Sequence, residues 1–179
     1  TMCGIFGIDS ADDAANLAYL GLYALQHRGQ ESSGICAWDG ERMHVERGMG
    51  HVAEIFPDKV LARLPGRRAM GHTRYSTAGS SVVANAQPIV VKTSMRPIGI
   101  VHNGNLTNAL TLRQELIQSG AIFPSTSDTE VILHLLSRSQ KRRVVERFIE
   151  AIRQIEGAWA LVSLTNDMMI GARDPIGIR

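Results

Sequence analysis

Apolar and polar residues follow two kinds of pattern along the chain, one typical of strands and one typical of helices. The short apolar run "CGIFGI" at residues 3–8 mixes isoleucine with small residues and predicts a strand. The next apolar positions, up to about Gln26, recur at helical spacing and predict a helix capped by Asp9 and Ser10. We therefore expect a strand and then a helix in this first segment.

A hairpin and two further strands are predicted next. The stretches "GICAW" and "RMHVERG" flank Asp39-Gly40, a dipeptide that strongly favours a tight turn. "AMGHTRY" and "IGIVHN" also have strand character, and each ends in polar residues. These two strands therefore carry polar side chains to their ends, where a site can form.

Three helices and a final pair of strands are predicted in the remaining sequence. "LTNALTLRQELIQSG" favours a helix with Thr107 as its cap and Gly120 as its stop. Ser127 and Glu130 have the spacing of a capping box and predict the start of another helix, and a charged amphipathic helix is expected near 141–155. "AWALVSL" and "MMIGAR" predict two paired strands. Strands and helices thus come in separate runs, which favours the α+β class over alternating βαβ units.

The composition indicates a soluble globular protein with one domain. The chain has 179 residues, of which 44% are hydrophobic and 20% are charged. The formal net charge of +2 argues against binding to nucleic acid or to a membrane surface, and no apolar run is long enough to span a bilayer. No secretory signal pattern is present, and the two cysteines fit a reducing, cytoplasmic compartment. The six histidines lack HExxH or CxxC companions, so we expect no metal site.

Cys3 is the first candidate for chemistry. A cysteine in an apolar strand is more often a packed small side chain than a nucleophile, and Cys36 in "GICAW" fits that interpretation. A nucleophilic thiol needs a base near neutral pH. An amino-terminal residue carries one, because its α-amine has a pKa of roughly 8. Cys3 could therefore supply both nucleophile and base, provided that the chain begins at that residue.

Polar residues at strand and helix ends add weaker candidates. Arg74 follows a strand and could bind a carboxylate, although a surface arginine beside a turn is an equally simple interpretation. Asn103 and Gly104, expected between a strand and a helix, could form an oxyanion hole or merely a common Asn-Gly turn. Asp128 could bind an ammonium group or simply favour the helix dipole. Taken together with Cys3, these residues match an amino acid with a reactive side-chain carbonyl, and glutamine is the obvious member.

Several motifs resemble one family over practically the whole chain. "CGIFGI", "LQHRGQESSGI", "GHTRYSTAGSS", "NAQP", "HNGNLTNA" and "TSDTEVI" are similar to the glutaminase domain of the amidophosphoribosyltransferases, the first enzymes of purine biosynthesis. The resemblance implies an N-terminal-nucleophile hydrolase fold, a four-layer αββα sandwich. It further implies that Cys3 attacks the glutamine amide, releases ammonia and leaves a glutamyl thioester for water to hydrolyse.

The same resemblance implies roles for individual residues. Asn103 and Gly104 match the oxyanion hole of the family, while Arg74 and Asp128 match its binders of the glutamine carboxylate and ammonium. Two further residues, Arg28 and Tyr75, occupy matching positions near the site. Thr77, in a loop from Arg74 to about Ala84, resembles the segment that closes over glutamine.

Other implied features belong to a longer enzyme. The glutaminase domain is expected to span residues 3–179, and a phosphoribosyltransferase domain is expected to follow Arg179. Ammonia would pass to phosphoribosylpyrophosphate in that domain and give phosphoribosylamine. Mg²⁺ and, in some members, an iron–sulfur cluster are expected only there, so no cofactor is expected in residues 3–179. The complete enzyme is expected to be a homo-oligomer with no nucleic-acid or membrane partner.

Two residues precede the predicted nucleophile. Met2 is interpreted as the initiator methionine and Thr1 as a cloning scar that prevents its removal. While they remain, the nitrogen of Cys3 is an amide and cannot act as a base. We therefore expect that a chain retaining both residues is blocked, or acts only as a silent glutamine-binding module.

One rival function is a related amidotransferase half, such as that of glucosamine-phosphate or asparagine synthesis. The segments "QHRGQE" and "HNGNLTN" favour the purine-type enzyme over it.

Overall fold

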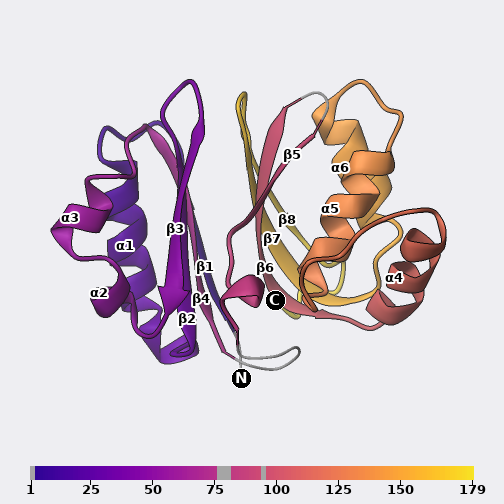
Figure 1. The fold of residues 1–179 in the computed structure, drawn as a ribbon, viewed down its shortest axis with the longest axis horizontal. Coiled ribbons are helices and arrows are strands. Elements are labelled where there is room, and N and C mark those ends of the chain that lie inside the picture. The colour runs from indigo at the N-terminus through magenta and orange to yellow at the C-terminus, as the bar shows by residue number, and fades with distance from the viewer. Residues whose placement is uncertain (1–2, 76–81, 94–95) are drawn as a thin grey trace.

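Two four-stranded antiparallel sheets lie face to face between two layers of helices (Figure 1). The computed structural model describes residues 3–75, 82–93 and 96–179. The four layers are helices, sheet, sheet and helices, which is the αββα sandwich that the family resemblance implies. The α+β class is therefore confirmed.

The first half of the chain forms one sheet with its helical layer. The strands lie in the order β1 (Gly4–Ile8), β4 (Arg68–Arg74), β2 (Ser32–Trp38) and β3 (Met43–Met49). Its outer face is covered by α1 (Ala14–Ala24), α2 (Val52–Ile55) and α3 (Asp58–Leu61) (Figure 1). A 3₁₀ turn, η1 (Gln26–Arg28), follows α1.

The second half of the chain forms the other sheet. Its order is β5 (Ile89–Lys92), β6 (Pro97–Leu106), β7 (Gly157–Thr165) and β8 (Met169–Arg173). The helices α4 (Ala109–Gln118), α5 (Thr129–Arg138) and α6 (Val144–Ile152) cover its outer face (Figure 1). A second 3₁₀ turn, η2 (Val83–Asn85), precedes β5.

The alternation of side chains along each strand divides the apolar residues among three cores. On β6, Ile100 packs among the side chains of α5 and α6, whereas the next residue, Val101, packs against Met70 of the other sheet. The space between the sheets therefore receives residues 70, 72 and 74 from β4 and residues 101 and 103 from β6. This alternation turns Arg74 and Asn103 towards the space between the sheets.

Most predicted elements are present, but three predicted caps are wrong. The first helix begins at Ala14, because Ser10 has a left-handed φ of 64° and its neighbour Ala11 bonds to Arg67 instead. Asn108 rather than Thr107 is the N-cap of α4. Gly120 follows the end of that helix with a φ of +93°, as a helix stop requires.

The predicted capping box at α5 is also wrong in its partners. Asp128 is the N-cap residue, and the Glu130 carboxylate accepts hydrogen bonds from Ser125 rather than from Ser127. The Ser127 hydroxyl accepts from the N–H of Thr129 at 3.3 Å. The helix thus starts at the predicted place with a different set of hydrogen bonds.

The sequence patterns also misplaced one functional pair and missed some short elements. Asn103 and Gly104 lie inside β6, which continues to Leu106, and not in a turn between strand and helix. The helices α2 and α3 and the strand β5 have four residues each, too few for a periodic pattern to develop. The predicted hairpin is confirmed, with the Asp39 carboxylate accepting from the N–H groups of Glu41 and Arg42.

Candidate active site

Cys3 immediately precedes β1, an edge strand of the first sheet. Its Sγ lies 3.7 Å from the carbonyl oxygen of Tyr75, and its own carbonyl oxygen accepts a hydrogen bond from Arg28 Nε at 3.0 Å. Burial raises the pKa of the Cys3 thiol, and the nearby positive charge of Arg74 offsets part of that effect. The thiol therefore needs a base before it can act as a nucleophile near neutral pH.

Cys36 has a different environment. Its side chain is fully buried between the two sheets, in the cluster that includes Met70 and Val101. Burial raises the pKa of its thiol to about 12. Cys36 is thus a packed core residue, as its apolar sequence context indicates.

Arg74 ends β4, one position beyond Thr73, which pairs with Gly4. The residue is only 6% exposed, and its guanidinium forms an ion pair with the Glu31 carboxylate. The backbone supports this pair, because the N–H of Glu31 donates to the carbonyl oxygen of Arg74 at 3.1 Å. The structure therefore places a buried, charge-paired arginine next to Cys3.

Asn103 and Gly104 are neighbours on β6: Asn103 faces the first sheet, whereas Gly104 lies on the opposite face, beside the His102 ring. Asn103 is 6% exposed, and within residues 3–75, 82–93 and 96–179 its side-chain amide has no hydrogen-bond partner. Gly104 has a φ of +156°, and a Cβ there would lie 2.1 Å from the carbonyl oxygen of Ala158. Only glycine fits this close approach of β6 to β7. The strand thus presents an unengaged amide next to a tightly fixed backbone.

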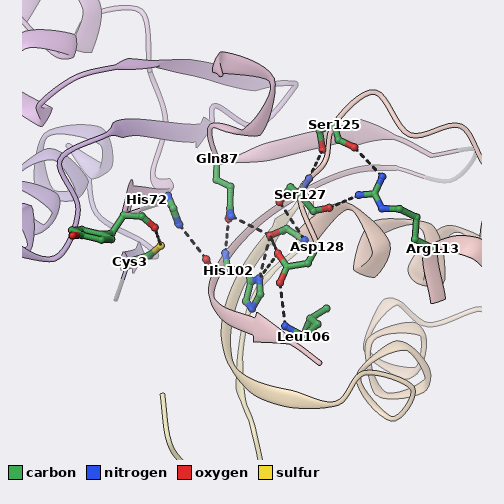
Figure 2. Close-up of polar contacts among 11 residues, drawn as sticks. Cys3, His72, Gln87, His102, Leu106, Arg113, Ser125, Ser127 and Asp128 are labelled. Carbon is green, nitrogen blue, oxygen red and sulfur yellow. Dashed lines mark hydrogen bonds and ion pairs between the residues drawn. The ribbon is translucent and has the colours of Figure 1, made fainter. Parts of the chain in front are cut away.

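Asp128 occupies the N-cap position of α5, and its carboxylate faces several donors (Figure 2). Its Oδ2 accepts from the N–H of Leu106 at 3.1 Å, and its Oδ1 lies 3.5 Å from His102 Nδ1. Burial alone would raise the pKa of this carboxyl, but the hydrogen bonds from His102, Leu106 and Thr129 outweigh it and hold the pKa below its usual value. Asp128 is therefore a carboxylate at neutral pH.

The five main candidates converge. Arg74 and Asp128 both act electrostatically on the Cys3 thiol, one lowering and the other raising its pKa. Asn103 and Gly104 lie three and two residues before Leu106, which binds Asp128. The nucleophile, a cation, an anion and an unengaged amide thus gather at one end of the sandwich.

The remaining predicted residues have mixed outcomes. Arg28 holds the backbone of Cys3, and Tyr75 contacts Sγ through its carbonyl oxygen while the residue itself is 43% exposed. Thr77 lies outside the described residues, as do Thr1 and Met2. The predicted roles of those three residues therefore stay predictions.

Several residues at this site were not predicted as functional. They surround the candidates and comprise Glu31, His72, Gln87, His102 and Thr129. All of them lie within motifs that carry the resemblance, such as "NAQP" and "HNGNLTNA". Their position within the family motifs was therefore a signal of function, but their chemical role depends on partners that only the folded structure brings close.

The described residues were also searched for metal sites and for membrane-spanning helices. Across the described ranges, no three His, Cys, Asp or Glu side chains are grouped so that they could hold a metal ion. In the same residues, no helix has the length and apolar character that crossing a membrane requires.

Comparison with known proteins decides the family. A family model described as a glutamine amidotransferase domain matches residues 72–179. The chain belongs to the glutamine amidotransferase domain family. The expectation that it is part of an enzyme is thereby confirmed.

Individual proteins similar to this chain lead to the same family assignment. Amidophosphoribosyltransferase from Rhizobium etli is 52% identical over 99% of this chain. The solved "allosteric regulatory enzyme of purine biosynthesis" superposes with a TM-score of 0.94 at 40% identity over 98% of the chain. Glutamine phosphoribosylpyrophosphate amidotransferase from Bacillus subtilis gives 0.92 at 39% identity, also over 98% of the chain. The N-terminal-nucleophile hydrolase fold that the resemblance implies is confirmed by these superpositions.

The match covers only part of each relative. The chain spans 36% of the Rhizobium etli enzyme and 38% of each of the two solved chains. The similarity therefore concerns one domain of a larger protein in each case.

Proposed function

We propose that this domain hydrolyses the side-chain amide of glutamine, with Cys3 as the nucleophile. The observation that carries the proposal is that residues of opposite charge, Arg74 on β4 and Asp128 beside β6, lie near Cys3. Cys3 Sγ lies 3.7 Å from the carbonyl oxygen of Tyr75, the residue after Arg74. Across the sheets, His72 of β4 bonds at 3.1 Å to the carbonyl oxygen of His102, whose imidazole lies 3.5 Å from the Asp128 carboxylate.

A free α-amino acid carries one carboxylate and one ammonium group, and the charges of Arg74 and Asp128 complement them. Membership of the glutamine amidotransferase domain family supports glutamine as that amino acid.

The proposed chemistry proceeds in two stages. The Cys3 thiolate adds to the amide carbon, and the carbonyl oxygen becomes an oxyanion that the Asn103 side-chain N–H and the Gly104 backbone N–H stabilise. The C–N bond then breaks as the nitrogen takes up a proton and leaves as ammonia. Water adds to the resulting thioester, and loss of the Cys3 thiol gives glutamate.

The base in this scheme is the α-amine of Cys3. Burial raises the pKa of the thiol, so the thiolate forms only when a neighbouring group accepts the proton. A free α-amine has a pKa of roughly 8 and is suited to that exchange. The scheme therefore requires protein in which Cys3 is the first residue.

The remaining contacts bind the substrate. Arg74 is assigned to the α-carboxylate and Asp128 to the α-ammonium. Arg28 fixes the Cys3 backbone through its 3.0 Å hydrogen bond, which limits movement of the nucleophile. Tyr75 and Thr77 are proposed to line the glutamine pocket.

The activity of the whole protein is a further part of the proposal. The Rhizobium etli relative is named an amidophosphoribosyltransferase, and this chain covers 36% of it. We infer that the domain, spanning residues 3–179, supplies ammonia to a phosphoribosyltransferase domain that uses phosphoribosylpyrophosphate. Mg²⁺ and any iron–sulfur cluster are assigned to that second domain, and a homo-oligomer in the cytoplasm is expected.

A glutaminase assay tests the proposal directly. Protein beginning at Cys3 is expected to release glutamate and ammonia from glutamine, and the Cys3→Ala variant is expected to bind glutamine without turnover. Calorimetry measures binding in both proteins. Binding without turnover in the protein that begins at Cys3 would show a silent binding module instead, and absence of binding would refute the assignment of glutamine.

Joining the domain to a phosphoribosyltransferase domain from a relative tests the second part. Glutamine consumption that depends on phosphoribosylpyrophosphate supports the purine-type enzyme. Consumption that is indifferent to phosphoribosylpyrophosphate would favour another amidotransferase.

A further inference from the structure

A buried hydrogen-bond network lies behind the proposed site and centres on His102 of β6 (Figure 2). The His102 residue is 2% exposed. Its Nδ1 lies 3.1 Å from the Thr129 hydroxyl and 3.5 Å from Asp128 Oδ1. The alternation along β6 explains the direction, since His102 shares a face with Ile100, which packs on the helices. The imidazole therefore lies between the strand and the N-terminus of α5.

Gln87 fixes the direction of the hydrogen bonds. Its Oε1 accepts from the backbone N–H of His102 at 2.6 Å, so its Nε2 is the atom that donates to Thr129 Oγ1, at 3.0 Å. The Thr129 hydroxyl is then an acceptor for Gln87, and its own hydrogen is directed to Asp128 Oδ1, 3.5 Å away. The donors of Gln87 and Thr129 thus form a chain that ends at the Asp128 carboxylate.

The proton position on His102 follows from the same contacts. A carboxylate only accepts hydrogen bonds, so Nδ1 faces Asp128 favourably only when it carries the hydrogen. Within the described part of the chain, Nε2 has no hydrogen-bond partner and is buried. A buried N–H without an acceptor is more costly than a buried lone pair, which also favours the proton on Nδ1.

The other edge of the ring lies against the predicted oxyanion hole. A Cβ built on Gly104 would approach His102 Nε2 to 2.9 Å, so the ring occupies the space beside that glycine. The carbonyl oxygen of His102 also accepts a hydrogen bond from His72 Nε2 of the opposite sheet, at 3.1 Å. One residue therefore touches the Asp128 carboxylate, the Gly104 backbone and the other sheet.

We propose that His102 is a positioning residue of the glutamine site. Its Nδ1–H donates to the Asp128 carboxylate and so orients it towards the substrate ammonium, while its ring packs against the Gly104 backbone and holds it in place. This inference rests on the proposed function, because it takes Asp128 as the ammonium binder. His102 does not touch the Cys3 thiol in this arrangement and acts through its neighbours.

A pair of variants separates positioning from packing. His102→Asn keeps an N–H close to the place of Nδ1, whereas His102→Leu has nearly the same shape as the asparagine variant and no donor. Both remove the ring, so they share any loss due to packing. Activity is measured on glutamine and on glutaramate, the analogue that lacks the α-ammonium, with protein beginning at Cys3.

The ratio of kcat/KM between these two substrates is the decisive readout. In His102→Leu the preference for glutamine is expected to fall about tenfold or more, because no donor orients the Asp128 carboxylate for its hydrogen bond to the substrate ammonium. In His102→Asn the preference is expected to stay within about threefold of the wild type. Equal loss on both substrates in both variants would overturn the inference and leave a purely structural histidine.

If the His102 variants fail to fold, a measurement on the unaltered protein still tests the inference. Nitrogen-15 NMR of the imidazole reports which ring nitrogen carries the hydrogen. A hydrogen on Nδ1 that responds to Asp128→Asn supports the inference, and a neutral ring protonated on Nε2 overturns it. If the unaltered protein does not hydrolyse glutamine, the proposed function fails first and the inference fails with it. An active enzyme with an unchanged substrate ratio in His102→Leu defeats the inference alone.

Discussion

The two ends of the proposed glutamine site lie on different sheets and are built differently. On the first sheet, Arg74 is already paired with the Glu31 carboxylate. On the second, Asp128 receives hydrogen bonds from its neighbours, including the Leu106 N–H, and holds no arginine or lysine partner among the described residues. A substrate carboxylate must therefore share the guanidinium with Glu31, whereas a substrate ammonium meets a carboxylate that no strong cation compensates. The comparison indicates that the Asp128 end contributes more to the preference for amino acids.

Removing the proposed nucleophile, which lies between the two ends of the site, is expected to have the largest effect. Cys3→Ala should lower glutamine hydrolysis by about 10³-fold or more, because no other thiol is available at the site. Glutamine binding should persist, since the two charged residues remain. Cys36→Ala is the matched control and should leave the rate unchanged, because its thiol is buried between the sheets. A rate in Cys3→Ala within tenfold of the wild type would contradict the mechanism.

Neutralising the anionic end is expected to have the next largest effect. Asp128→Asn keeps the size of the side chain and removes the charge, so kcat/KM for glutamine should fall by roughly 10- to 100-fold, mainly through KM. Steady-state kinetics on glutamine and glutaramate measure this. The variant should treat glutaramate much as the wild type does, and an equal loss on both substrates would place the ammonium elsewhere.

Changing the cationic end should have a smaller effect. Arg74→Lys keeps the charge but lacks the planar guanidinium, which can donate hydrogen bonds to Glu31 and to a substrate carboxylate at the same time. The KM for glutamine should therefore rise about tenfold. The same kinetics provide the measurement. A larger loss here than in Asp128→Asn would reverse the ranking of the two ends.

The rigid backbone of the second sheet can be tested through stability. In Gly104→Ala the new methyl group would meet the Ala158 carbonyl oxygen at 2.1 Å, so the free energy of unfolding should fall by about 1–3 kcal/mol. Urea unfolding measures it. Gly171→Ala on β8 is the control, since nothing lies within 4 Å of a Cβ there. Equal midpoints for the two variants would argue against this close approach.

The histidine that joins the two sheets should make stability depend on pH. Burial lowers the pKa of His72 to about 3, against about 6.5 in an unfolded chain. The unfolded state therefore binds more protons between these values, and stability falls as the pH drops below about 6, by roughly 1 kcal/mol per pH unit. His72→Gln keeps a donor for the His102 carbonyl and should weaken that dependence.

Urea unfolding at about pH 6.5 and pH 5 compares the two proteins. His27→Gln removes a histidine at an exposed position and serves as the control. The same loss of stability in wild type and His72→Gln would show that His72 does not carry the effect.

The sequence predicted the candidate site residues better than the residues that support them. Cys3, Arg74 and Asp128 have side chains whose possible chemistry is evident from the motifs, and the charges of Arg74 and Asp128 both influence the Cys3 thiol. The partners Gln87, His102 and Thr129 belong to three separate segments, and only the packing of β6 against α5 makes them neighbours. That packing depends on long-range contacts, which local patterns do not contain.

The same limit explains the errors in the fold. Most strands and helices follow from periodicity, which is local information, whereas the four-layer arrangement was implied only by the family resemblance. The start of α1 depends on the left-handed conformation of Ser10 and on a bond from Ala11 to the carbonyl oxygen of Arg67, far along the chain, and neither is visible in a capping pattern. Asn103 and Gly104 resemble a turn dipeptide, yet pairing with β7 keeps them in the strand.

The identity of the nucleophile is the central claim, and covalent trapping tests it most directly. Protein beginning at Cys3 is treated with diazo-oxo-norleucine, a reactive glutamine analogue, and the adduct is located by mass mapping. The account predicts one adduct, on Cys3, that excess glutamine suppresses and that Cys3→Ala abolishes. An adduct on Cys36, or labelling that persists in Cys3→Ala, would contradict it.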